Sequence, residues 1–215
     1  MITLPLLDIL QFLLAAARWT VMLSIIAFIG GGTLGLCLLL LRFAYRWGAR
    51  VVHYYVELFQ GTPLLLQLFL VFFGLPLLGV EVSPLMAAGI ALTFYSAAFL
   101  TEIWRGCVEA IPKGQWEASA AVGLDFVSQM RDVILPQALR IAIPPTVGFL
   151  VQLIKATALS SIVGFNELTR AGTILSNATF QPLIVYGVVA SIYFAMCYPL
   201  TFSSRLLERK LREAS

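Results

Sequence analysis

Five apolar segments, each long enough to cross a lipid bilayer as a helix, dominate this sequence. They cover residues 19–41, 57–78, 85–104, 141–165 and 183–203. About 20 apolar residues span the hydrocarbon core of a bilayer, so each segment fits one crossing. Only 12% of the residues are charged, against about one quarter in soluble domains, so the chain cannot cover a water-facing surface. The sequence therefore predicts an all-α polytopic membrane protein with about five transmembrane helices.

The positive charges predict the orientation of these helices, because Lys and Arg concentrate in the cytoplasmic loops of membrane proteins. Eleven of the 14 fall in the first loop, the third loop and the C-terminal tail: Arg42, Arg46, Arg50, Arg105, Lys113, Arg131, Arg140, Arg205, Arg209, Lys210 and Arg212. With five crossings, this asymmetry places the N-terminus outside and the C-terminus in the cytoplasm. The net charge of +3 does not predict a nucleic-acid-binding surface.

The chain is expected to divide into three parts around one transmembrane domain. Residues 1–18 are apolar but carry Asp8 and no Lys or Arg before Arg18, whereas a secretory signal has a basic start. We therefore expect an interfacial segment there. Residues 19–204 are predicted to form a single transmembrane domain, and residues 205–215 a basic cytoplasmic tail.

The cytoplasmic segment 105–140 is about 36 residues long, and long loops are commonly functional. Within it, residues 115–122 are good helix formers, Gly123 permits a sharp bend, and residues 126–135 have apolar side chains at helical spacing. Pro136 is expected to end the second helix. The residues predict two short amphipathic helices joined at Gly123, which either dock into a groove on a partner or lie on the membrane surface.

Residues 112–136 of this segment resemble the EAA loop of ABC-importer permeases. That motif reads Glu-Ala-Ala, three residues, Gly, nine residues, Ile, one residue, Leu-Pro. Here Ser replaces the second Ala and Val replaces the Ile, and both changes are conservative in size. The matching positions are Glu117, Ala118, Ser119, Gly123, Val133, Leu135 and Pro136.

Flanking stretches resemble the polar amino-acid branch of these permeases, so the resemblance covers nearly the whole chain after Trp19. The similar stretches are residues 95–115, the Gly-Thr-Pro-Leu at 61–64 and the Lys-Ala-Thr-Ala-Leu at 155–159. Gln60 departs from this branch, which often has an arginine before the Gly/Ser-Thr-Pro. A charge-based role at that position is therefore not carried over.

The resemblance implies a type I ABC-importer-like fold and the ATP-driven import of a polar amino acid across a bacterial inner membrane. A cytoplasmic coupling helix would fit a cleft on a separate ATP-binding subunit, present as a dimer that holds the ATP and Mg²⁺. A second permease subunit, identical or a sister chain, and an extracytoplasmic solute-binding protein would complete the importer. The residues implied in ATPase coupling are Glu117, Ala118, Ser119, Gly123, Leu135 and Pro136.

Lys155 is the one charged residue near the middle of a predicted span. A lysine there costs about 2.5–3.5 kcal/mol, so its side chain should face protein or water. Lys155 either lines the substrate path, where it could meet a carboxylate, or pairs with Glu102 or a backbone carbonyl. The candidate path residues are Lys155, Gln152, Thr157, Ser160 and Glu102.

Other function classes lack their characteristic residues. No Gly-x-x-x-x-Gly-Lys-Ser/Thr loop is present to hold nucleotide phosphates, so we expect no ATP hydrolysis and no bound cofactor in this chain. The sequence has no CxxC motif and no Cys/His cluster, so we expect no metal site. Residues 30–35 match GxGxxG inside an apolar span, where Gly31 and Gly35 instead predict close helix packing. An ion-coupled secondary amino-acid carrier is the alternative, and it requires buried acidic groups and inverted repeats. An intramembrane hydrolase would need a base or metal ligand within a span, whereas the single histidine, His53, falls in a predicted loop.

Overall fold

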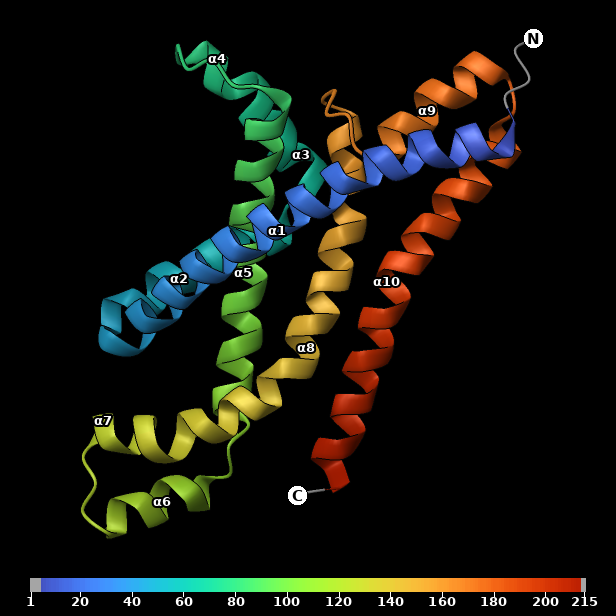
Figure 1. Ribbon diagram of the computed structural model, residues 1–215. Helices are drawn as coiled ribbons and strands as arrows, with labels where there is room; N and C mark the ends of the chain where they lie inside the picture. The colour runs from blue at the N-terminus through green and yellow to red at the C-terminus, as the bar shows by residue number, and fades with distance from the viewer. Residues whose placement is uncertain (1–4, 214–215) are drawn as a thin grey trace.

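The computed structural model describes the backbone of residues 5–213 and the side chains of residues 5–209. All regular structure in this part of the chain is helical, and Figure 1 shows long helices crossing one another with a short hairpin at one end. The helices are α1 (Leu6–Ala44), α2 (Arg46–Gly61), α3 (Leu64–Phe69), α4 (Leu75–Leu77), α5 (Pro84–Glu109), α6 (Lys113–Ala121), α7 (Phe126–Ser128), α8 (Leu135–Ala156), α9 (Leu168–Thr179) and α10 (Pro182–Glu213). Two π-helical turns (Leu70–Gly74 and Gln129–Ile134) follow α3 and α7, and a 3-10 turn (Thr157–Ser161) follows α8.

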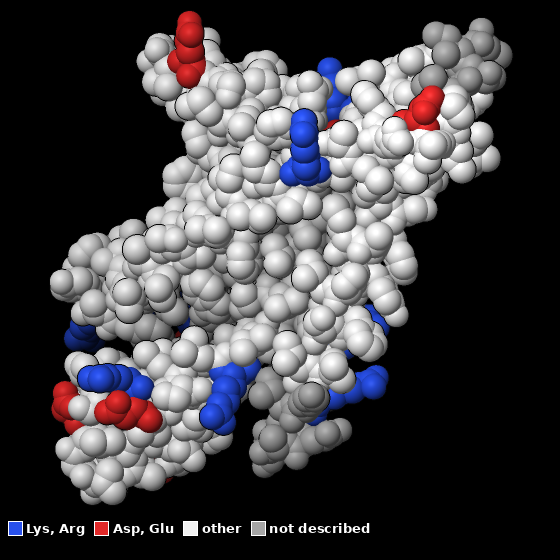
Figure 2. Space-filling model, in the orientation of Figure 1, with Lys and Arg blue, Asp and Glu red and all other residues white. Residues whose placement is uncertain are grey.

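Four helices among the described residues are long and apolar enough to cross a membrane, and a bent pair brings the number to five if it is one span. Figure 2 shows the charged side chains gathered toward the two ends of the visible face, with a broad uncharged band between them. An uncharged band of this kind is the surface that a lipid bilayer requires. The predicted all-α membrane fold with about five spans is confirmed.

The predicted domain limits fall inside helices. α1 is one helix of 39 residues, so no break separates the expected interfacial segment from the transmembrane domain at residue 19. Similarly, residues 205–213 of the expected tail continue α10. Residues 1–4 and 214–215 lie outside the described part of the chain. The interfacial location of residues 1–18 and the cytoplasmic location of the tail stay predictions.

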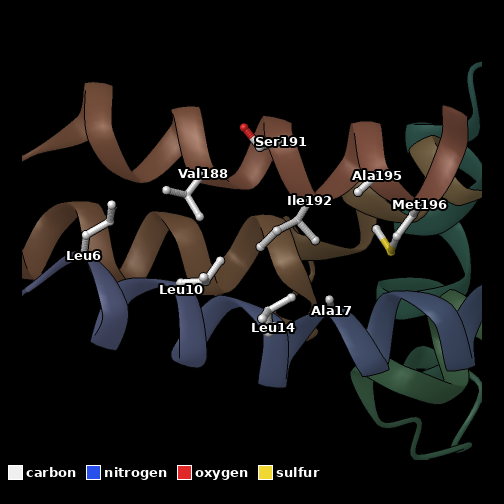
Figure 3. Close-up of a pocket in the computed structure, with 9 residues that line it drawn as sticks. All are labelled: Leu6, Leu10, Leu14, Ala17, Val188, Ser191, Ile192, Ala195 and Met196. Carbon is white, nitrogen blue, oxygen red and sulfur yellow. The ribbon is translucent and has the colours of Figure 1, made fainter.

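The N-terminal half of α1 packs against the two last helices of the chain. Ile9 and Leu13 are almost completely buried in a cluster with Leu168 of α9 and Val185 of α10. Beside this cluster, an apolar groove of about 520 Å³ runs between α1 and α10. Figure 3 shows it lined by aliphatic side chains with Ser191 as the one hydroxyl among them. This end of the molecule is therefore held together by apolar packing between its first and last helices.

The second predicted span, 57–78, is wrong as a continuous helix. α2 ends at Gly61, and the helical segment Leu64–Leu77 leaves it at an angle of 100°. Pro63 has no N–H and disfavours helical angles in the residue before it, and Thr62 is accordingly extended, with φ −111° and ψ 142°. The amide of Gln67 closes the break by donating to the carbonyls of Phe59 (2.8 Å) and Thr62 (3.1 Å).

Close packing between α1 and α5 confirms the prediction for Gly31 and Gly35. A Cβ added to Gly31 would lie 2.3 Å from the Cβ of Ser96, and one added to Gly35 would lie 3.1 Å from the carbonyl oxygen of Ala97. The hydroxyl of Thr101 also donates to the Gly35 carbonyl at 3.1 Å. Small residues thus allow two backbones to approach closely within the membrane.

Pro136 does not end a helix, contrary to expectation. The chain stays helical from Phe126 to Ser161, so the predicted fourth span at 141–165 is continuous with the second helix of the hairpin. The π-helical turn explains this result, because the Leu135 N–H bonds to the Met130 carbonyl five residues back. Pro136 then occupies the first turn of α8, where a missing N–H is tolerated.

Candidate functional site

The candidate coupling site is a helical hairpin formed by α6, Gly123 and α7. Gly123 has φ +84°, and nothing lies within 4 Å of its Cβ position. Glycine is therefore needed here because of the backbone angle, and a side chain would not clash with its surroundings. At the start of α7, the Asp125 carboxylate caps the helix by accepting from the Ser128 N–H at 3.3 Å. Hydrogen bonds from Ser128 hold the pKa of this carboxyl below its usual value. The predicted bend at Gly123 is confirmed.

The tip of the hairpin is apolar and exposed. Val122, Phe126 and Val127 are 76%, 55% and 68% exposed. The motif residues Glu117 and Ala118 also face outward on α6. In the charge view, acidic and basic side chains surround this end of the molecule (Figure 2). An apolar patch with a carboxylate beside it is a surface suited to a groove on another protein.

The base of the hairpin is fastened to the membrane helices. Val108, Ile111, Ile134 and Ala138 form a buried cluster, against which Trp116 of α6 packs. In the same region, the Gln137 amide donates to the Gln115 side chain at 3.3 Å and thus ties α8 to α6.

The other motif residues divide between the interior and the surface of the hairpin. Ser119 is buried, and its hydroxyl donates to the Trp116 carbonyl at 2.9 Å. Leu135 and Pro136 remain exposed, and the buried contact at this turn comes instead from Ile134. A displacement of the hairpin would therefore be transmitted to α5 and α8.

The candidate path residues on α8 and on the 3-10 turn after it differ in exposure. Gln152 and Lys155 share an exposed face of the protomer. Thr157 and Ser160 are fully buried, and their hydroxyls donate to the carbonyls of Ile154 (2.7 Å) and Thr157 (2.6 Å). The open face of α8 thus presents an ammonium group and an amide, while the two hydroxyl residues stay in the interior.

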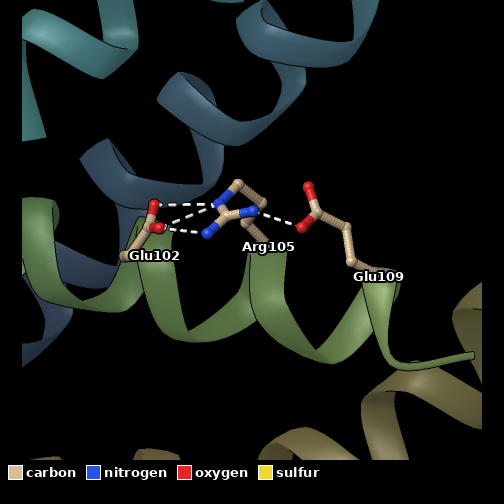
Figure 4. A network of polar contacts seen from close by, with 3 residues as sticks. All are labelled: Glu102, Arg105 and Glu109. Carbon is tan, nitrogen blue, oxygen red and sulfur yellow. Dashed lines mark hydrogen bonds and ion pairs between the residues drawn. The ribbon is translucent and has the colours of Figure 1, made fainter.

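Glu102 does not lie beside Lys155. Figure 4 shows Arg105 between Glu102 and Glu109, all three on the last turns of α5. The Arg105 Nε lies 2.9 Å and 3.0 Å from the two Glu102 oxygens. α5 and α8 run in opposite directions (Figure 1), so Glu102, toward the C-terminal end of α5, and Lys155, at the C-terminal end of α8, lie toward opposite ends of the molecule. Among the described side chains, Lys155 forms no salt bridge with Glu102.

Glu167 is a buried carboxylate that the sequence analysis did not single out. Its side chain accepts from the N–H groups of Thr169 (2.9 Å) and Arg170 (2.8 Å) and from the Tyr193 hydroxyl (2.9 Å). The Thr20 hydroxyl of α1 lies 3.4 Å away. Burial raises the pKa of this carboxyl. Glu167 caps α9 and joins three helices, and no residue preference pointed to it, because glutamate is not among the usual N-cap residues.

A model of the family described as "Binding-protein-dependent transport system inner membrane component" matches residues 31–213. The arginine transport system permease protein ArtQ of Bacillus subtilis is 37% identical, with 95% of this chain and 92% of the relative covered. The glutamine transport system permease protein GlnP of Escherichia coli is 33% identical, with 94% of each chain covered.

Solved structures agree with these relatives. The structure of an amino acid ABC transporter with histidines superposes with a TM-score of 0.90 at 30% identity, over 97% of this chain and 100% of the other. The MetNI methionine ABC transporter, in an inward-facing conformation, shares the fold with a TM-score of 0.74 at 22% identity, over 93% of this chain and 96% of the other. The chain therefore belongs to the family of inner membrane components of binding-protein-dependent transport systems.

Proposed function

We propose that this chain is the permease subunit of an ATP-driven importer that carries a polar amino acid across a bacterial inner membrane. The observation that carries the proposal is the exposed hairpin of α6 and α7, whose base packs against α5 and α8. Relatives over nearly the full length of the chain are permeases named for amino-acid transport. Neither the fold nor these relatives support an ion-coupled carrier.

The hairpin is proposed to couple the permease to a separate ATPase. Glu117, Ala118 and the apolar tip around Gly123 would contact a cleft on an ATP-binding subunit, which holds the ATP and Mg²⁺. Ser119 would stabilise α6 from its buried side. Leu135 and Pro136, at the start of α8, would transmit the movement of the hairpin to that helix. Closure of two ATPase subunits would then push the hairpin and rock the membrane helices, exposing the path alternately to each side.

The substrate path is proposed to follow the exposed face of α8. A lysine within a membrane helix has to face protein or water, so the face bearing Gln152 and Lys155 should be covered by a second permease subunit, identical or a sister chain. In the gap between the two subunits, the Lys155 ammonium would attract the substrate carboxylate, and the Gln152 amide would hydrogen-bond to it. Thr157 and Ser160 would support the helix behind this face, while Glu102 would act at the opposite end of the path.

The proposal also includes the remaining parts of the importer. An extracytoplasmic solute-binding protein would deliver the amino acid to the outer end of the path. The N-terminus would face outside and the C-terminus the cytoplasm, because the basic residues of the chain concentrate on the side of the hairpin.

Reconstitution into proteoliposomes tests the proposal. The permease, its cognate ATPase and its solute-binding protein would be assembled, and L-glutamine, L-arginine and L-cystine would be offered in turn. We expect uptake of at least one of them to require ATP, and the loaded binding protein to stimulate ATP hydrolysis. Uptake by the permease alone, driven by an ion gradient, would overturn the proposal.

A further inference from the structure

α8 links the coupling hairpin to the candidate path through one helical rod. Residues 126–161 are helical without a break, so the hairpin and Lys155 lie on two ends of the same element. Figure 1 shows the rod running beside α6 at first and then turning into the direction of α5. Pro144 and Pro145 lie inside α8 and divide the rod into a cytoplasmic arm, which begins at the hairpin, and an outer arm, which carries Lys155.

The two prolines weaken the rod at this position. A proline has no N–H to donate, and its ring crowds the carbonyl four residues earlier. Pro144 and Pro145 therefore leave the carbonyls of Arg140 and Ile141 without their usual helical donors. Two adjacent missing hydrogen bonds lower the cost of bending α8 here.

Neighbouring helices hold this position from two sides. From α5, the Trp104 indole Nε1–H donates to the hydroxyl of Thr146 at 3.0 Å. From α10, the Ser204 hydroxyl donates to the carbonyl of Pro144 at 2.9 Å. Both bonds connect residues far apart in the sequence, and both meet α8 within one residue of the proline pair.

Space for movement lies next to the same position. A cavity of about 230 Å³ separates the cytoplasmic arm of α8 from α1 and α5. Its walls include the small side chains Ala138 and Ala142 of α8, Leu36 and Leu39 of α1, and Trp104 of α5. The cavity opens onto the surface, because Leu36 and Leu139 in its lining are 49% and 64% exposed, and the arm can shift into it without displacing other helices.

We propose that Pro144 and Pro145 form a joint at which α8 bends when the hairpin is pushed, and that Trp104 and Ser204 are positioning residues that hold the joint in its present conformation. The inference rests on the proposed function, because it assigns the path by which motion at the hairpin reaches Lys155. The cytoplasmic arm moves with α6 and α7, the outer arm carries Gln152 and Lys155, and the two polar contacts set the resting angle between the arms.

Variants that remove one polar contact test the positioning residues. Trp104→Phe keeps the ring and deletes the donor, and Thr146→Val keeps the shape and deletes the acceptor. In the reconstituted complex, we expect each variant to raise ATP hydrolysis in the absence of loaded binding protein by roughly two- to tenfold, the population change that one lost hydrogen bond gives. The number of amino acids moved per ATP should fall accordingly.

Further variants separate a positioning role from a merely structural one. Trp104→Phe and Thr146→Val remove the same bond, so the double variant should change hydrolysis no more than either single variant. Ser204→Ala should act in the same direction, while Ser203→Ala, whose hydroxyl bonds only within its own helix to the Pro199 carbonyl, should leave both quantities unchanged. Wild-type hydrolysis and coupling in Trp104→Phe, Thr146→Val and Ser204→Ala would overturn the positioning assignment.

The joint itself is tested by the double variant Pro144→Ala/Pro145→Ala, which restores two N–H donors to α8. We expect the complex to assemble with its ATPase and to hydrolyse ATP, but to take up L-glutamine, L-arginine or L-cystine at least about tenfold more slowly than wild type. Wild-type uptake per ATP would overturn the joint. If the wild-type complex itself showed no ATP-dependent uptake, the proposed function would fail, and this result is distinct from a failure of the joint.

Discussion

The side-chain nitrogen of Gln67 on α3 lies 2.8 Å from the carbonyl oxygen of Phe59 on α2, across the break in the second span. Gln67 is 7% exposed, and the same nitrogen also bonds to the carbonyl and hydroxyl of Thr62. A single amide therefore pairs the carbonyls that the end of α2 leaves without helical donors.

Replacing Gln67 by Leu should destabilise the protein by about 0.5–1.5 kcal/mol, because the part-buried carbonyls at the break would lose their hydrogen-bond partner. The measurement is the thermal unfolding of the detergent-solubilised protein. Gln60→Leu removes an exposed amide from the adjoining turn and serves as the control. Equal melting temperatures for the two variants would contradict the role of Gln67.

Gly31→Ala should lower stability by about 1–3 kcal/mol, since the new Cβ would meet the Cβ of Ser96 at 2.3 Å and force α1 and α5 apart. Gly187→Ala provides the matched control, because nothing lies within 4 Å of its Cβ position on α10. There the substitution should be neutral or stabilise by a few tenths of a kcal/mol through helix propensity. The same melting experiment in detergent compares the two, and equal losses would argue against close packing of α1 on α5.

Gly123→Pro should uncouple ATP hydrolysis from uptake, because proline fixes φ near −65°, whereas Gly123 has φ +84°. We expect uptake to fall at least about tenfold while the chain still inserts in the membrane. Glu117→Lys, which reverses the exposed charge of α6, should have the same effect. Gly114→Ala is the control on the same hairpin, since it adds a methyl group in open space. Normal uptake by both test variants would remove the coupling assignment.

Lys155→Met should reduce the initial rate of ATP-dependent uptake by roughly tenfold or more, the effect of losing one hydrogen bond to a charged group. Membrane insertion should be unchanged or improved, because a charge is removed from a span. Arg18→Gln, which deletes an exposed charge on α1, should leave uptake as it is. Uptake rates at varied concentrations of loaded binding protein distinguish the two variants. A wild-type rate for Lys155→Met would place the substrate elsewhere.

Glu167→Ala should destabilise the protein by about 2–3 kcal/mol, because α9 loses its cap and the Tyr193 hydroxyl loses its acceptor. Asp125→Ala removes a cap of the same kind from the exposed start of α7 and should cost less. Thermal melts of both variants at neutral pH test the difference. A larger loss for Asp125→Ala would mean that burial does not strengthen the Glu167 contacts.

Local backbone structure and packing could be predicted from the sequence where a single residue type determines them. Gly31 and Gly35 indicated a close helix contact, and Gly123 indicated the bend between α6 and α7. The motif spacing located the hairpin of α6 and α7, while its role in coupling stays a prediction. The glycine predictions succeeded because glycine has one dominant structural effect in each of these settings.

Whether a proline ends a helix could not be predicted from the proline alone. Pro63 breaks the second span although that span was expected to be continuous, while Pro136 was expected to end a helix and does not. The difference depends on neighbouring backbone: an extended Thr62 in one case and a π-helical turn in the other. Glu167 was missed for a similar reason, since its partners Thr20 and Tyr193 come from helices far away in the sequence.

The contact between α1 and the last helices joins parts of the chain that are synthesised at different times. Ile9 and Leu13 are synthesised long before their buried neighbours in α9 and α10, and the Thr20–Glu167 bond joins residues 147 positions apart. The N-terminal half of α1 therefore reaches its final packing only after α9 and α10 have been made, whereas the contact between α1 and α5 can form earlier.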